Sequence, residues 1–102
     1  MKKSLLVARM REIREQNEFY EPVLDNLLDT PLGQLLLDLD TLVDVGYSLV
    51  RQCEPLLINP VINAMERGII DLYKRREFGY AFCYFGIYQG LVPKLEALRK
   101  VA

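Results

Sequence analysis

The sequence predicts an all-α protein with one domain, residues 1–102, and three observations lead to this fold class. Between residues 32 and 43, apolar side chains recur every three or four positions, the spacing of one helix face. Thr30 and Pro31 precede this stretch, where threonine can cap free amides and proline fits the first helical position. Hydrophobic residues are 51% and charged residues 26% of the 102 positions, which is typical of a folded domain.

Periodicity also predicts the first element and bears on the aromatic segment near the C-terminus. Leu6, Met10 and Ile13 fall at i, i+4 and i+7, so we expect an N-terminal helix over residues 3–17. In residues 78–90 (FGYAFCYFGIYQG) aromatic residues alternate, a pattern that also fits a strand. Because a lone strand would have no partner, we predict that this segment is helical.

Prolines mark the other predicted helix starts. Asn59-Pro60 precedes an apolar stripe in the same way as Thr30-Pro31, and a last helix is expected over residues 93–101. Pro22, Pro55 and Pro93 each fit a first helical position, where the missing amide hydrogen costs no hydrogen bond.

The chain contains an approximate internal repeat. A shift of 33 residues aligns EPVLDN with EPLLIN and DLDTLVDVGYS with DLYKRREFGYA without a gap, and eight of the 31 aligned pairs are identical. Average composition would give roughly two or three identities. We therefore predict two similar helical motifs, residues 21–51 and 54–84, with an extra helix at each end. Two copies are too few for an open solenoid, so we expect them to close around a pseudo-twofold axis.

Gly46 and Gly79 occupy equivalent positions in the two motifs. We expect both to be structural, because glycine permits a turn with positive φ and lets helices approach closely. A turn at each glycine would divide its motif into a longer and a shorter helix.

Composition excludes several kinds of chemistry. The sequence has no histidine and only four serine and threonine residues, which removes Ser-His and Cys-His nucleophile pairs and most zinc sites. It also has no glycine-rich phosphate loop. Without a calcium-loop pattern, Asp38, Asp40 and Asp44 are interpreted as a solvated helix face. We expect a protein that is not an enzyme and that has no metal and no cofactor.

The aromatic segment is the candidate binding element, since six of the ten aromatic residues lie within positions 78–88. Such a cluster suits a peptide-binding groove, while core filling is the favoured interpretation for its phenylalanines and an equal alternative for its tyrosines. We expect a peptide or partner chain to lie between the two motifs. The groove would be lined by four tyrosines and have a basic run at its rim: Tyr47, Tyr80, Tyr84 and Tyr88, with Lys74, Arg75 and Arg76.

Charge is uneven along the chain, although the net charge is only −1. Residues 1–17 carry +3, residues 18–54 carry −7 and residues 55–102 carry +3. These segments can neutralise one another within one fold or steer one copy onto another as a homodimer. The alternative function is nucleic-acid binding through residues 74–76 and the N-terminal helix, although three adjacent charges also suit a helix C-terminus.

Cysteine content and hydropathy indicate the cellular compartment of the protein. Cys53 and Cys83 are too few for a disulfide framework, so we expect two buried thiols in a reducing compartment, with one bridge as the alternative. The chain has no uncharged run of 18 residues, and the apolar stretch near its start is shorter than a signal peptide needs. We therefore expect an intracellular protein without membrane association.

The two motifs EPVLDN…DLDTLVDVGYS and EPLLIN…DLYKRREFGY, within one domain of 102 residues, support one resemblance. The chain resembles a small orphan protein of an Acidianus filamentous virus, a virus of a hyperthermophilic archaeon. Viral proteins of such hosts are usually rich in lysine and isoleucine, whereas this chain is leucine-rich with five lysines. The resemblance implies an accessory viral protein in the host cytoplasm and brings neither an activity nor a site residue.

Overall fold

The computed structural model of the protein describes residues 2–16 and 30–101. This part of the chain is helical and contains no strand, which confirms the predicted all-α class and the helix over residues 78–90. Its elements are α1 (Lys2–Gln16), α3 (Pro31–Gln52), α4 (Ile58–Lys74) and α5 (Phe78–Val101).

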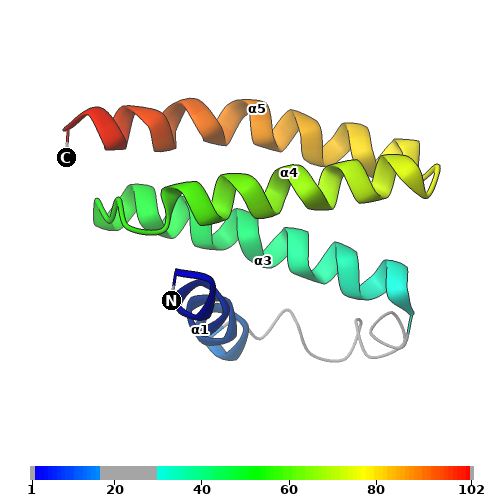
Figure 1. The fold of residues 1–102 in the computed structure, drawn as a ribbon, viewed down its shortest axis with the longest axis horizontal. Helices are drawn as coiled ribbons and strands as arrows, with labels where there is room; N and C mark the ends of the chain where they lie inside the picture. Colours follow the sequence, from blue (N-terminus) through cyan, green and yellow to red (C-terminus); the bar gives the residue numbers. More distant parts are fainter. Residues whose placement is uncertain (1, 17–29, 102) are drawn as a thin grey trace.

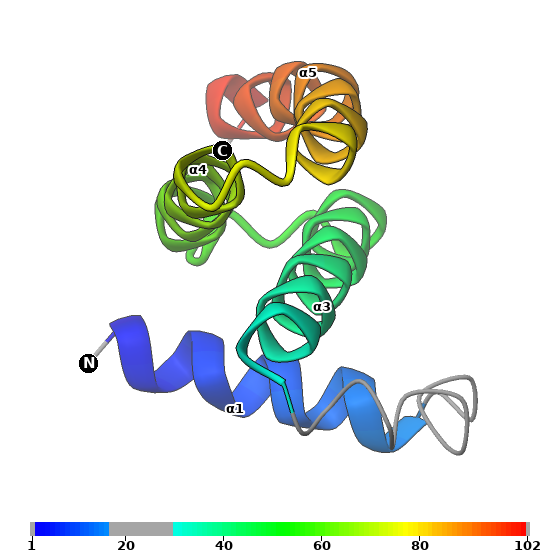
Figure 2. The same ribbon diagram turned by 90° about the vertical axis from the view of Figure 1, so that its right-hand side faces the viewer.

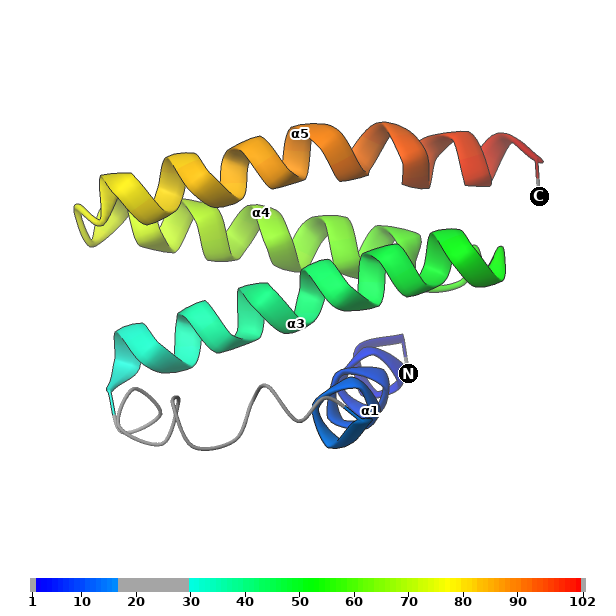
Figure 3. The same cartoon turned by 180° about the vertical axis from the view of Figure 1, so that it is seen from behind.

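Helices α3, α4 and α5 run along the length of the molecule, whereas α1 crosses α3 at a steep angle (Figures 1 and 2). From behind, α3 lies between α1 on one side and the hairpin of α4 and α5 on the other (Figure 3). The central helix α3 is therefore covered from two directions, while α5 has neighbours on one side only.

The core lies among α3, α4 and α5 and is built from the apolar stripes seen in the sequence. Leu6 of α1 joins this cluster at 6% exposure. Burying one large apolar side chain stabilises a fold by roughly 1.5–3 kcal/mol, so these stripes hold the helices together. The fully buried core residues of the three long helices include Leu39, Val45, Leu49, Val61, Met65, Leu72, Leu91 and Leu95.

The predicted start of α3 is confirmed at the level of single atoms. Pro31 is the first helical residue, and the Gly33 amide donates a hydrogen bond of 2.9 Å to Thr30 Oγ1. This side chain satisfies one of the amides that a helix N-terminus leaves free.

Polar contacts hold α1 against the rest of the molecule. Arg9 forms an ion pair of 2.6 Å with Glu54, at the end of α3. Arg14 pairs with Asp38 and donates a hydrogen bond of 3.1 Å to the buried Thr41 hydroxyl. Both ion pairs join the positive N-terminal segment to the negative middle of the chain, so part of the uneven charge is neutralised within the fold.

The prediction of turns at Gly46 and Gly79 is wrong. Gly46 lies inside α3 and Gly79 is the second residue of α5, and neither has positive φ. The left-handed positions are Cys53 (φ 55°) after α3 and Arg76 (φ 61°) after α4. The amide of Glu77 donates to the Leu72 carbonyl oxygen, which completes the usual helix-ending motif around Arg76.

Close approach, the second role expected for glycine, applies to Gly46. A methyl group added there would lie 2.6 Å from Leu91 Cδ2, so α5 can pack closely on α3 only because position 46 lacks a side chain. Gly68 does the same between α4 and α3, where an added methyl group would lie 2.7 Å from Leu39 Cδ2. Gly79 faces open space.

The predicted helix starts at Pro55 and Pro93 are also wrong. Pro55 lies in the loop before α4, which begins at Ile58, close to the predicted start at Asn59-Pro60. Pro93 lies inside α5, so residues 93–101 continue one long helix and are not a separate one. The N-terminal helix is confirmed as α1, and Pro22 lies outside the described residues.

The structure does not show the internal duplication. Residues 31–51 belong to one unbroken helix, whereas the residues aligned with them by the 33-residue shift contain the end of α4, a turn and the start of α5. The aligned segments therefore differ in secondary structure.

Candidate functional site

The four predicted tyrosines do not line one groove within the described structure. Tyr47 on α3 lies beneath the Lys94 ammonium, 5.6 Å from the ring centre, while Tyr80 on α5 is 47% exposed. Tyr84 is buried against α3, and the Tyr88 hydroxyl contacts α4.

Tyr84 and Tyr88 use their hydroxyl groups to join helices. The Tyr84 hydroxyl donates to Asp40 on α3, and the Tyr88 hydroxyl donates to Glu66 on α4. The bond to Glu66 raises the pKa of Tyr88 to about 12, because it stabilises the protonated phenol. Partial burial raises the pKa of Asp40 above its usual value, although the hydrogen bond from Tyr84 acts in the opposite direction. Both hydroxyls therefore have structural partners within the described chain.

The basic run forms the turn between α4 and α5 and is exposed to solvent. Arg75 pairs with Asp71 at 3.2 Å, four residues earlier in α4. Lys74 and Arg76 make no ion pair with another described residue. The turn thus presents two cations that are free of ion pairs within the described part of the chain.

An exposed apolar surface lies next to this turn. Six large side chains of α4 and α5 are 44–68% exposed. One is Tyr80, and we call the other five the aromatic surface: Ile70, Tyr73, Phe78, Phe82 and Phe85. An edge-to-face contact of 5.2 Å between the rings of Tyr73 and Phe78 joins the two helices. Phe82 and Phe85 follow Phe78 at helical spacing, so the three rings lie on one face of α5.

Core filling is wrong for the phenylalanines of this segment. The α5 residues that face the bundle are Ala81, Tyr84, Leu91 and Leu95, spaced three, seven and four residues apart. This spacing defines one helix face, and the three phenylalanines fall outside it. The leucines after position 90 identify the face of α5 that packs against the bundle. This signal in the sequence could have shown that the phenylalanines lie outside that face. Ile70 and Tyr73 join the surface only because α4 and α5 form a hairpin.

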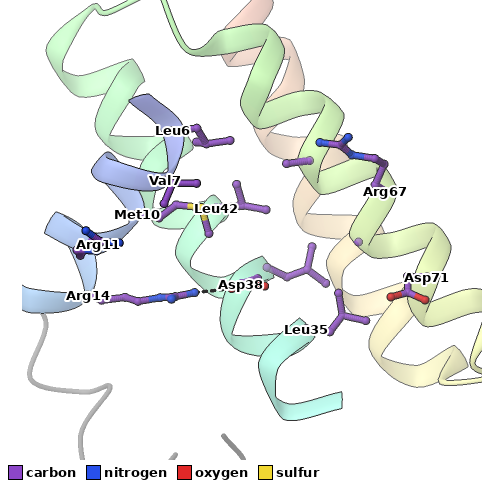
Figure 4. A pocket seen from close by; sticks show the side chains of 13 residues that line it. Leu6, Val7, Met10, Arg11, Arg14, Leu35, Asp38, Leu42, Arg67 and Asp71 are labelled. Carbon is purple, nitrogen blue, oxygen red and sulfur yellow. Dashed lines mark hydrogen bonds and ion pairs between the residues drawn. The ribbon is translucent and has the colours of Figure 1, made fainter. Parts of the chain in front are cut away.

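A hollow of about 480 Å³ lies between α1, α3 and α4 (Figure 4). It contains none of the predicted site residues and lies apart from the aromatic surface. A smaller one of about 300 Å³ includes Tyr47 with Ile13, Gln16, Asp44 and Arg51. The groove between two motifs, as predicted from the repeat, is thus not one of these hollows.

Both cysteines are free thiols and both are exposed, so the expectation of buried thiols is wrong. Cys53 is exposed because it forms the left-handed end of α3, and Cys83 because it lies on the outer side of α5. Within the described residues, no cluster of acidic and cysteine side chains could hold a metal ion. None of the described helices is both long enough and apolar enough to cross a membrane.

Comparisons of the chain with models of protein families, with curated protein sequences and with solved structures gave no match. The structure defines a class, a small helical protein with an exposed aromatic surface.

Proposed function

We propose that this protein is a non-enzymatic interaction module whose aromatic surface binds a peptide or partner chain that carries apolar and acidic side chains. The observation that carries the proposal is the exposure of Tyr73, Phe78, Phe82 and Phe85 on the α4–α5 hairpin, where the Tyr73 and Phe78 rings are in edge-to-face contact. The site that we propose is therefore the outer side of the α4–α5 hairpin and not a groove between two motifs.

The size of the surface supports a binding role. A large aromatic side chain has roughly 200 Å² to bury, so five side chains about half exposed present on the order of 500 Å² of apolar area. Soluble monomers rarely expose a contiguous patch larger than a few hundred Å² unless it binds something. Aromatic residues are also the side chains that most often dominate the energy of protein interfaces.

The charges beside the surface favour an acidic partner. Lys74 and Arg76 stand at its edge without ion pairs to other described residues. Arg76 adopts a left-handed backbone conformation that glycine accepts at lower cost. A strained arginine at such a position is consistent with use of its side chain.

The alternative of nucleic-acid binding has weaker support. Two arginines of the N-terminal helix, Arg9 and Arg14, are engaged in ion pairs with Glu54 and Asp38. The basic turn lies where α4 and α5 join, at the opposite end of the long helices from the α3–α4 loop that Arg9 contacts (Figure 1). The cations therefore do not form one continuous basic face.

An accessory viral role, as the resemblance implies, stays a proposal.

Selection from a display library of random short peptides tests the proposal. We expect the enriched peptides to combine aromatic or aliphatic residues with aspartate or glutamate. Phe82→Gln should weaken the binding of such a peptide at least tenfold, because it removes the most exposed ring of the surface. Neutralising Lys74 and Arg76 should weaken binding by about two- to fivefold and reduce its salt dependence, as expected of charges at an interface rim.

Tyr47→Gln is the matched control, since it removes an exposed aromatic ring from α3 and leaves the aromatic surface intact. Binding that Tyr47→Gln and Phe82→Gln reduce equally would contradict the proposal, and so would a selection that enriches no peptide. Sedimentation of the protein alone detects the homodimer, which would mean that the surface is occupied by a second copy. Salt-dependent binding of DNA or RNA that ends when Arg75 and Arg76 are neutralised would favour the alternative.

A further inference from the structure

The larger hollow has the features of a small-ligand site. Its volume of about 480 Å³ lies within the range of roughly 300–1,000 Å³ that ligand pockets occupy. Apolar side chains of three helices make most of its wall, among them Leu6 and Met10 from α1, Leu39 and Leu42 from α3, and Ala64 from α4. Figure 4 shows α1 and α4 on opposite sides of this space, with α3 between them.

The charged residues that line this pocket carry a net positive charge, and two of its arginines form no ion pair with another described residue. Of its charged residues, Arg14 pairs with Asp38, and Asp71 pairs with Arg75. Arg67 on α4 and Arg11 on α1 form no ion pair with another described residue. Arg67 lines the pocket from α4 and is exposed to solvent (Figure 4). The pocket thus combines an apolar wall with two unneutralised guanidinium groups.

We propose that this pocket binds a small amphipathic anion, with one aliphatic chain packed between α1, α3 and α4 and an anionic head group bound by Arg67. A guanidinium group binds a carboxylate through two parallel hydrogen bonds, which suits Arg67 to the head group. The volume of about 480 Å³ is in the range of small-ligand pockets and leaves room for an aliphatic chain of medium length.

The contacts of α1 are consistent with such a site. Arg9 and Arg14 fix this helix to Glu54 and Asp38 through ion pairs that do not use Arg67. Met10, which lies between those two contacts, lines the pocket. A ligand chain there would replace open space between α1 and α4 with apolar contact.

Decanoate, used below the concentration at which it forms micelles, is the probe for this proposal. Titration calorimetry of the full chain should show saturable binding, at least tenfold tighter than that of decyltrimethylammonium, which has the same chain and the opposite charge. Arg67→Gln should weaken decanoate binding at least tenfold. Ala64→Phe, which fills the pocket from α4, should abolish it, and circular dichroism confirms that each variant remains helical.

Two control variants separate this pocket from the aromatic surface. Arg76→Gln removes an exposed arginine elsewhere, and Phe82→Gln removes the most exposed aromatic ring; neither should change decanoate affinity more than twofold. The proposal is overturned if decanoate does not bind saturably or if the cationic probe binds equally well. It is also overturned if Phe82→Gln weakens binding and Arg67→Gln does not. None of these results depends on peptide binding at the aromatic surface.

Discussion

The two longest helices, α3 and α5, use their apolar residues in different ways. Helix α3 lies between α1 and the α4–α5 hairpin (Figure 3), and the most exposed of its large apolar side chains is Tyr47, at 36%. Helix α5 has neighbours on one side, and Phe78, Phe82 and Phe85 are 44–68% exposed. The comparison shows that α5 carries more aromatic side chains than the core uses. Apolar residues of α3 should therefore determine stability, whereas those on the outer side of α5 should determine binding.

The largest effect is expected from a leucine of α3. Leu39 is fully buried, and Leu39→Ala should lower the free energy of unfolding by about 2–5 kcal/mol through lost burial and a cavity. Phe82→Ala, at a side chain that is 68% exposed, should change it by no more than about 0.5 kcal/mol. Urea unfolding followed by circular dichroism measures both, and equal costs would end the distinction between the two helices.

The glycines of the same two helices should respond with opposite signs. At Gly46 an added methyl group meets the buried Leu91, so Gly46→Ala should destabilise the protein by about 1–3 kcal/mol. Gly86 faces open space on α5, so Gly86→Ala should stabilise it by about 0.5–1 kcal/mol through higher helix propensity. Thermal unfolding gives both values, and a gain at position 46 would show that α3 and α5 are not in close contact there.

The ends of α3 and α4 offer a matched pair of substitutions. Cys53 and Arg76 both adopt left-handed conformations, so Cys53→Gly and Arg76→Gly should each stabilise the protein by about 1 kcal/mol. Only Arg76→Gly should weaken the binding of an acidic peptide, because only that position borders the aromatic surface. Unfolding and peptide titration are measured on both variants. Equal peptide affinity in the two would remove Arg76 from the proposed site.

The smallest expected effect concerns the contact between α3 and α5 at Asp40. Because the folded-state pKa of Asp40 is raised, the folded protein holds this proton more tightly than the unfolded chain. The contribution of Asp40 to the free energy of unfolding should therefore fall as the pH rises from 3.8, the usual pKa of an aspartate, through the higher pKa of the folded state. Tyr84→Phe removes the hydrogen bond that lowers this pKa, and carboxyl NMR titration should show a further upward shift. A downward shift would contradict this account.

Helix type and helix position could be predicted from the sequence, because apolar periodicity and capping residues are local signals. Thr30 and Pro31 start α3 as expected, and Leu6, Met10 and Ile13 identify α1. The ends of the helices could not be predicted in this way. Glycine is the usual residue for a left-handed helix end, but here Cys53 and Arg76 hold those positions.

The candidate site was predicted only in part. The aromatic segment and the basic run at residues 74–76 do lie together, since one forms α5 and the other the turn before it. Which aromatic residues of α5 are exposed depends on which face of the helix packs against α3 and α4, and the leucines after position 90 indicate that face. The contribution of Ile70 and Tyr73 depends on the α4–α5 hairpin, which is a tertiary property. Tyr84 and Tyr88 consequently face neighbouring helices, whereas the phenylalanines face outward.

NMR mapping of a selected acidic peptide on the labelled protein locates the peptide-binding site residue by residue. We expect shifts of amide and aromatic signals to concentrate at Tyr73, Phe78, Phe82 and Phe85 and at the turn that includes Arg76, and we expect Phe82→Gln to abolish them. Shifts concentrated at the pocket around Arg67, or shifts that persist unchanged in Phe82→Gln, would contradict this expectation.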